Sequence, residues 1–190
     1  MITVITPCTR VNNLPTILRS LGKVKSWIEW VIVYDSSVIK EMDTRITMYQ
    51  EYNVTMKLLQ CDNELSEGNA WRLRNYGMEF ATGDYLYFLD DDNIMKSNLY
   101  EGVQDYLYKY DLIFFNQLRR DKIIGVNLPF SMEDIDTGQM LVSRNLKSRW
   151  SPSTDYREER LYVKSLLEEV GKDKMVSIPA ALAYYNFLKE

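Results

Sequence analysis

The sequence predicts an α/β fold, namely a single-domain α/β/α sandwich with a mostly parallel central sheet. Short apolar runs rich in β-branched residues alternate with amphipathic helical stretches through most of the chain, and this order is typical of a parallel sheet covered by helices. The length of 190 residues is that of one domain. The hydrophobic fraction of 46% and the charged fraction of 26% are ordinary for a globular protein.

The first strand and the first helix follow from local signals. Residues 1–6 form an apolar, β-branched run that ends before Pro7, which predicts a buried strand. Asn12 or Asn13 can cap the helix that follows, whose apolar residues recur at helical spacing until Gly22.

The alternation continues up to an acidic segment. Apolar runs and helical spacing predict, in order, a strand at 29–34, a helix near 38–51, a strand at 54–59, a helix at 67–80 and a strand at 85–89. The last of these strands leads directly into Asp90, Asp91 and Asp92. We therefore expect three adjacent carboxylates at the end of a buried strand.

Regular alternation fades in the second half of the chain. Its predicted elements are a helix near 97–108, a strand at 112–115, an edge hairpin around 123–126, a strand at 138–143, a helix at 155–170 and a short strand at 175–178. The apolar, Tyr-rich tail at 180–188 either closes the core or forms the surface of a homodimer. No apolar run approaches the roughly 18 residues that would span a bilayer, so we expect no membrane span.

The composition excludes several classes of function. The net charge of −4 gives no electrostatic footprint for nucleic acid or for an anionic membrane. The sequence has no histidine, which excludes Ser-His-Asp and Cys-His catalysis and leaves acid and base chemistry to carboxylates, Lys and Tyr. Cys8 and Cys61 lie far apart without a CxxC motif or a preceding signal peptide, so we expect a cytoplasmic protein with two reduced, buried thiols.

The acidic run at 90–92 predicts a metal site. Three adjacent carboxylates at the end of a buried strand repel one another unless a cation or hydrogen-bond donors compensate them. Oxygen ligands without His or thiolate suit Mg²⁺ or Mn²⁺, which take their remaining ligands from water and from the phosphates of a substrate. The alternative is a solvated acidic turn in which Asp92 caps the next helix.

Two other segments can meet a nucleotide at the same edge of the sheet, because open α/β sheets bind ligands beyond the carboxyl ends of their strands. Asp35 follows the second predicted strand and can accept a hydrogen bond from the N3–H of a uracil ring, although Asp-Ser-Ser is also an ordinary turn. Arg72 or Arg74 can reach a diphosphate bidentately, although a solvated helix face with an ion pair fits them equally.

Four segments together resemble the family 2 type of glycosyltransferase with the GT-A fold. They are ITPCTR at 5–10, VIVYDSS at 31–37, WRLRNYGMEFATGDYLYFLDDDN at 71–93 and DTGQMLVSR at 136–144. The resemblance covers essentially the whole chain, and FLDDDN in register behind RNYG and ATGDY is its most specific part.

The resemblance implies roles for the acidic residues. It assigns contact with the nucleotide base to Asp35, contact with the ribose or the metal to Asp91, and direct ligation of a metal that bridges the donor diphosphate to Asp92. We assign Asp90 to the metal and to the nucleotide sugar, and Arg74 to the nucleotide sugar.

The first motif carries the remaining nucleotide contacts. Thr6, Pro7 and Arg10 match the strand end that meets the nucleotide in this family. The chain departs from the family pattern at Tyr34, where a second acid is usual, and at Cys8, where a small or polar residue is usual. The identity of the base therefore follows less directly than the metal site.

An inverting enzyme of this family needs a carboxylate that deprotonates the acceptor hydroxyl. The candidates are Asp155, Glu158 and Glu159. Glu159 and Asp155 lie one and two turns before Val163 on the apolar stripe of the predicted helix, so we place Asp155 first as the base and Glu159 second. Asp155 and Glu158 also have the spacing of a capping box, which is the structural alternative, and a retaining reaction would need no base.

Other residues in the last third can face the acceptor. Asp136, in the DTGQ segment, is predicted to lie in a loop near the acceptor and the anomeric carbon. Trp150 and Tyr156 can stack on sugar faces, although packing is the more ordinary role for both.

These observations predict a Mn²⁺- or Mg²⁺-dependent glycosyltransferase that moves a sugar from a nucleoside diphosphate, UDP in the first place, to a hydroxyl of a glycan, glycoprotein or lipid acceptor. Residues 1–93 would bind the donor and residues 94–190 the acceptor. The alternatives are a non-catalytic module that binds a nucleotide sugar, a phosphatase of the haloacid dehalogenase type, and a nucleotidyltransferase. The phosphatase needs a later Lys and a second acidic pair that we cannot place, and the nucleotidyltransferase needs a Gly-rich phosphate loop that the first motif lacks.

Overall fold

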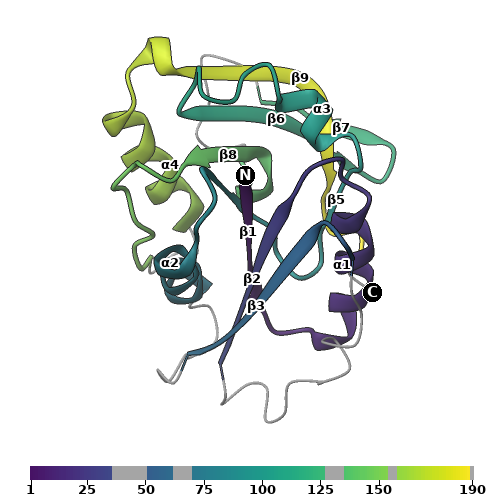
Figure 1. Ribbon diagram of the computed structural model, residues 1–190. Coiled ribbons are helices and arrows are strands. Elements are labelled where there is room, and N and C mark those ends of the chain that lie inside the picture. Colours follow the sequence, from purple (N-terminus) through teal and green to yellow (C-terminus); the bar gives the residue numbers. More distant parts are fainter. Residues whose placement is uncertain (36–50, 62–69, 127–134, 154–157, 189–190) are drawn as a thin grey trace.

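Figure 1 shows the computed structural model, which describes residues 1–35, 51–61, 70–126, 135–153 and 158–188. Within these ranges nine strands form one sheet in the order β3-β2-β1-β4-β8-β6-β9-β5, with β7 paired to β6. The strands are β1 (Ile2–Cys8), β2 (Ile28–Asp35), β3 (Val54–Cys61), β4 (Tyr85–Phe88), β5 (Ile94–Met95), β6 (Leu112–Arg119), β7 (Lys122–Ile124), β8 (Met140–Ser143) and β9 (Met175–Tyr184). The α-helices are α1 (Leu14–Gly22), α2 (Ala70–Phe80), α3 (Leu99–Val103) and α4 (Glu158–Glu169).

The fold is an α/β/α sandwich, as predicted. Helices α2 and α4 lie on one face of the sheet, and α1 and α3 lie on the other (Figure 1). Two apolar cores result, one on each face, because successive residues of a strand point to opposite sides. Helix α2 approaches β1 very closely, since a Cβ atom on Gly77 would lie 2.6 Å from Cγ2 of Ile5.

The sheet is mixed, so the prediction of a mostly parallel sheet is correct in part, for the first four strands and for the parallel pair of β6 and β9. Strands β3, β2, β1 and β4 are parallel neighbours. Strand β8 then inserts between β4 and β6 and runs antiparallel to both. Strand direction was inferred from the alternation of strands with helices, and that inference fails at β8, which follows the β7 hairpin and a 3₁₀ turn at Thr137–Gln139. It holds for β9, which follows α4 and is parallel to β6.

Several strands extend beyond their predicted ends, among them β6, which runs to Arg119 instead of stopping at residue 115, and β3, which runs to Cys61. Strand β1 continues through Pro7 to Cys8, where it pairs with β2 alone because its pairing with β4 ends at Ile5. Proline is tolerated where one side of a strand has no neighbour. Strand β9 runs to Tyr184 instead of stopping at residue 178, so the apolar tail closes the core, with Leu182 and Ala183 fully buried.

Three other predictions need comment. Asn13 stands at the start of α1, but its side-chain amide donates to the main-chain oxygen of Asp91 (2.8 Å) instead of capping the helix. The helix predicted at 97–108 is shorter, and turns follow α3. The helix predicted near 38–51 lies outside the described residues.

A buried carboxylate joins the first strands near their amino-terminal ends, away from the acidic run. Glu29 of β2 accepts hydrogen bonds from Thr3 Oγ1 (2.5 Å) and from the main chain and hydroxyl of Thr82 (both 2.7 Å). It also forms an ion pair with Lys57 Nζ at 2.6 Å. Burial raises the pKa of Glu29, but Lys57 and the hydrogen bonds outweigh burial and lower this pKa to about 2.

The model contains no helix in its described residues that is both long enough and apolar enough to cross a membrane. Cys8 and Cys61 are both buried and free of a disulfide.

Candidate active site

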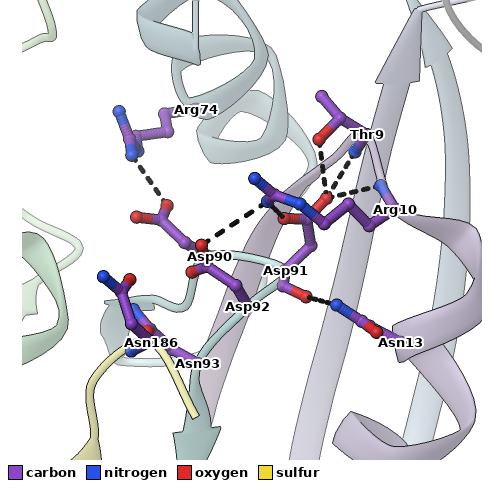
Figure 2. A network of polar contacts seen from close by, with 9 residues as sticks. All are labelled: Thr9, Arg10, Asn13, Arg74, Asp90, Asp91, Asp92, Asn93 and Asn186. Carbon is purple, nitrogen blue, oxygen red and sulfur yellow. Dashed lines mark hydrogen bonds and ion pairs between the residues drawn. The ribbon is translucent and has the colours of Figure 1, made fainter. Parts of the chain in front are cut away.

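The three carboxylates of the acidic run lie at the carboxyl end of β4, beside the end of the neighbouring parallel strand β1 (Figure 2). The chain turns sharply there, since the main-chain N–H of Asn93 donates to the carbonyl oxygen of Asp90 (3.0 Å). The turn sends the side chain of Asp90 toward Arg74, whereas the side chains of Asp91 and Asp92 both face Arg10. Their mutual repulsion is thereby reduced within the protein itself.

Asp91 is fully engaged by the segment that links β1 to α1. Its carboxylate accepts from the main-chain N–H groups of Thr9 and Arg10 (both 2.6 Å), from the Thr9 hydroxyl (3.0 Å) and from the Arg10 guanidinium (2.5 Å). The Asp91 main-chain oxygen accepts from Asn13. Asp91 therefore fixes the first motif against the acidic run. Thr9 and Asn13 are site residues that no sequence signal selected as contacts of the acidic run.

Asp92 and Asn93 are held by the end of the chain that follows β9. The main-chain oxygen of Asp92 accepts from the N–H of Leu188 (2.9 Å), and Asn93 Oδ1 accepts from the N–H of Asn186 (2.6 Å). The Asp92 carboxylate is nearly buried and lies 3.5 Å from the Arg10 guanidinium. Contacts between residues more than 90 positions apart have no local signal in a sequence, which is why they were not predicted.

Asp90 points to the opposite side, toward α2 (Figure 2). Its carboxylate forms an ion pair with Arg74 Nη2 at 2.7 Å. The Asp90 side chain is 30% exposed, whereas Arg74 is only 3% exposed. Of the two arginines considered for a diphosphate, Arg74 is thus buried against the acidic run, and Arg72 lies over the ring of Trp71 at 5.2 Å.

Asp136 lies at the start of the 3₁₀ turn that leads into β8. It forms a capping box with Gln139, accepts from the main-chain N–H of Gly138 (2.9 Å), and accepts from Gln117 Nε2 (3.1 Å). Burial and the negative charge of Asp90 raise the pKa of Asp136 to about 6, although the hydrogen bonds oppose them. Asp136 is therefore close enough to the acidic run for Asp90 to act on its charge, and its predicted place near the acceptor and the anomeric carbon stays a prediction.

The first turn of α4 brings two further carboxylates to this side. Glu159 is close enough to Asp136 to raise the pKa of Asp136, and it acts in the same direction on Glu158. Burial is the main cause of the raised pKa of Glu158, and the charge of Arg74 opposes it. Asp155, the first candidate for the base, lies outside the described residues, so its role stays a prediction.

The residues predicted to contact the nucleotide differ in burial. The Thr6 hydroxyl accepts from Trp30 Nε1 (2.9 Å) inside the core, and Pro7 and Asp35 are buried at the ends of β1 and β2. The Arg10 side chain is 47% exposed. The nucleotide contacts proposed for all four remain predictions.

Two features in which the sequence departs from the family pattern have structural consequences. Burial and the nearby Asp91 raise the pKa of Cys8 to about 12, so its thiol stays protonated. Tyr34 is the partner of Cys8 across the β1–β2 ladder.

Trp150 is buried and stacks on Tyr162 with a ring separation of 4.2 Å, so of its two predicted roles it has the packing role. Tyr156 lies outside the described residues.

The donor set can be compared with what a divalent metal requires. In the part of the chain that the structure describes, no three Cys, Asp or Glu side chains are arranged to hold a metal. Asp91 is occupied by protein donors, which leaves the carboxylates of Asp90 and Asp92. One or two carboxylates completed by water and phosphate oxygens are the usual environment of Mg²⁺, so these residues fit a metal that arrives with a diphosphate.

The fold and the site define an α/β enzyme domain with an acidic, arginine-flanked site at the carboxyl ends of parallel strands. The model of glycosyl transferase family 2 matches residues 3–172. The chain therefore belongs to this family of enzymes.

Relatives and solved structures agree with the family. An uncharacterized glycosyltransferase of Haemophilus influenzae is 28% identical over 154 residues, which are 77% of this chain and 50% of the relative. The S. aureus TarS 1-349 structure in complex with UDP-GlcNAc has a TM-score of 0.73 at 16% identity, covering 97% of this chain and 58% of that one.

A third similarity is to the mannosyltransferase PcManGT of Pyrobaculum calidifontis in complex with GDP-Man and Mn²⁺. Its TM-score is 0.69 at 13% identity, covering 100% of this chain and 57% of that one. At these identities the solved structures show a common fold. The chain spans about half the length of the curated relative that it matches.

Proposed function

We propose that the protein transfers a sugar from a nucleoside diphosphate sugar, UDP-linked in the first place, to a hydroxyl of a glycan or glycoconjugate acceptor, with Mn²⁺ or Mg²⁺ as cofactor. The observation that carries this proposal is the placement of two arginine-flanked carboxylates at the carboxyl end of β4 beside β1, Asp90 with Arg74 and Asp92 with Arg10. Family membership favours glycosyl transfer over the phosphatase and nucleotidyltransferase alternatives. The UDP-GlcNAc complex of TarS supports a UDP-sugar as the donor to test first.

The donor diphosphate would lie between the two sides of the site. Asp92, with Asp90, would hold the metal, and Arg10 adds a fixed positive charge on the exposed side. A bound divalent ion would neutralise the charge that builds on the departing diphosphate. Asp91 keeps Arg10 and the β1–α1 segment in register with the metal ligands, through the four hydrogen bonds described above.

The acceptor would approach from the side of α4 and the Thr137–Gln139 turn. Asp136 and Glu159 are the described carboxylates on this side, and Asp155 belongs to the segment just before α4. A base must be ionised to accept the proton of the acceptor hydroxyl. Asp136 meets this condition above about pH 6, the value to which burial and Asp90 raise its pKa.

The test is binding and turnover in one series. The protein is titrated with Mn²⁺ and UDP by calorimetry and then incubated with Mn²⁺ and a panel of nucleotide sugars, with release of the nucleoside diphosphate as the readout. Asp92→Asn should abolish metal-dependent UDP binding without loss of the fold. Asp105→Asn, an exposed carboxylate after α3, is the matched control. Wild-type protein that does not bind UDP in the presence of Mn²⁺ would refute the proposal.

A further inference from the structure

Arg74 is a charged side chain buried at a cost in free energy. It is 3% exposed, and within the described ranges its guanidinium hydrogen-bonds to Asp90 alone, at 2.7 Å. Its Nε and Nη1 atoms have no hydrogen-bond partner among the residues that the structure describes. Burying a charge with unpaired donors costs free energy, and an apolar side chain of similar volume would pack at lower cost. The charges of Asp90, Glu159 and Glu158 favour the cation against this cost, so Arg74 is placed where it faces the carboxylates of the site.

The guanidinium of Arg74 is held by an aromatic platform. It lies over the ring of Trp150 at 4.5 Å, an arrangement that favours a cation. Trp150 in turn stacks on Tyr162 of α4 and meets Phe88 of β4 edge to face at 5.2 Å. The platform therefore joins the strand that carries the acidic run to the helix that carries Glu159.

Asn75, the next residue on α2, fixes the platform from the main-chain side. Its side-chain amide donates to the main-chain carbonyl oxygen of Trp150 (2.8 Å), and its amide oxygen accepts from the main-chain N–H of Trp150 (2.9 Å). These two bonds fix the main chain of Trp150, and packing against Tyr162 and Phe88 holds its indole. The adjacent residues Arg74 and Asn75 thus both meet Trp150: Asn75 holds its main chain, and its ring lies under the Arg74 guanidinium.

We propose that Arg74 is a positioning residue that sets the Asp90 carboxylate for binding of the metal–diphosphate group of the donor, and that it acts through Asp90 without touching the donor. This inference rests on the proposed function. Without Arg74, Asp90 would be a partly exposed carboxylate beside Asp91 and Asp136, free to turn away from them. Groups that orient a metal ligand in this way are typically worth about 10–100-fold in metal affinity.

A double-mutant cycle tests the inference with Mn²⁺ and UDP as the probes. The variants are Arg74→Met, Asp90→Asn and the double variant, and the readouts are free Mn²⁺ by electron paramagnetic resonance and UDP affinity by calorimetry. Arg74→Met should weaken Mn²⁺·UDP binding about 10–100-fold. The double variant should bind no more weakly than Asp90→Asn alone, because coupled residues do not lose affinity additively. Arg19→Met, which removes an exposed charge from α1, is the control.

The outcomes separate this inference from the proposed function. If wild-type protein does not bind Mn²⁺·UDP, the proposed function fails. If it binds and the losses of Arg74→Met and Asp90→Asn add, or if either single variant binds as tightly as wild type, Arg74 does not act through Asp90 and the inference is overturned. Should Arg74→Met not fold, Arg74→Lys, which keeps the charge but not the planar group over Trp150, takes its place in the same cycle with the same criteria.

Discussion

The charge on Asp136 should cost the protein stability, and Asp136→Asn should recover it. The pKa of this carboxyl is raised from 3.8 to about 6 by burial and by Asp90. A difference of about two pH units between the folded and unfolded states corresponds to about 3 kcal/mol, at 1.36 kcal/mol per unit. Asn keeps an oxygen that can accept from Gly138 and Gln117, so the cap is retained while the charge is removed.

The pH dependence gives this prediction its sign. The folded pKa of Asp136 lies above the unfolded value. Its carboxyl group therefore lowers the free energy of unfolding least below pH 3.8, and the wild type loses stability as the pH rises through about 6. The advantage of Asp136→Asn should therefore be near zero at pH 3.5 and reach about 3 kcal/mol above pH 6.5. For a chain of this length that is a rise of about 6–12 °C in Tm.

The assay is urea unfolding of wild type and Asp136→Asn from pH 3.5 to 7.5 in a chelating buffer, since a bound cation would neutralise the same charge. Asp121→Asn, an exposed carboxylate in the β6–β7 turn, is the control and should change nothing. A gain that is the same at every pH would refute the electrostatic reasoning, as would no gain at pH 7.5. The same variant should lose sugar transfer, because a site carboxylate has been neutralised.

Three further outcomes are expected. Glu29→Gln should be less stable than wild type at pH 7 by up to about 3 kcal/mol, because the folded pKa of Glu29, about 2, lies below the unfolded value. The difference in stability should close as the pH falls from 4.5 toward 2. Equal urea midpoints at pH 7 would contradict this. Glu159→Gln should abolish transfer with UDP affinity intact, measured beside Glu168→Gln on the exposed side of α4; equal loss in both variants would argue against a specific role. Chelation of divalent ions should leave the Tm within about 2 °C, since Arg10 and Arg74 already compensate the acidic run, whereas Mn²⁺ with UDP should raise it; unfolding in chelator would show a structural metal instead.

Much of the fold was predictable because its first half is built from local signals. The apolar runs before Pro7, Asp35 and Asp90 are strands, and the helical spacing before Phe80 is α2. The direction of β8 was not predictable, because the sequence predicts no helix between the hairpin at 123–126 and this strand, and periodicity carries no direction. The length of β9 was missed for a related reason: residues 179–184 continue in the sheet through register shifts in the pairing with β6, which no local pattern announces.

The candidate site was predictable to the level of residue type, and less so to the level of partner. Strand ends on neighbouring parallel strands bring Arg10 and the acidic run together, as expected. The burial of Arg74 was not expected, because its place on α2 lies away from the apolar stripe. Only the packing of Trp150, which comes 76 positions later, closes over it.

The premise that three adjacent carboxylates require a metal has to be refined. Each of them has its own compensation: hydrogen-bond donors of the β1–α1 segment for Asp91, the Arg10 guanidinium at 3.5 Å for Asp92, and Arg74 for Asp90. The acidic run is therefore stable without an added ion, and a metal would have to share Asp90 and Asp92 with arginines already in place. Such a site should bind a bare cation weakly and a cation that brings phosphate oxygens better, since the phosphate can satisfy Arg10, the exposed arginine, when the metal takes Asp92 from it. Metal and donor should accordingly bind as a pair, and Mn²⁺ affinity that is equal with and without UDP would contradict this division of roles.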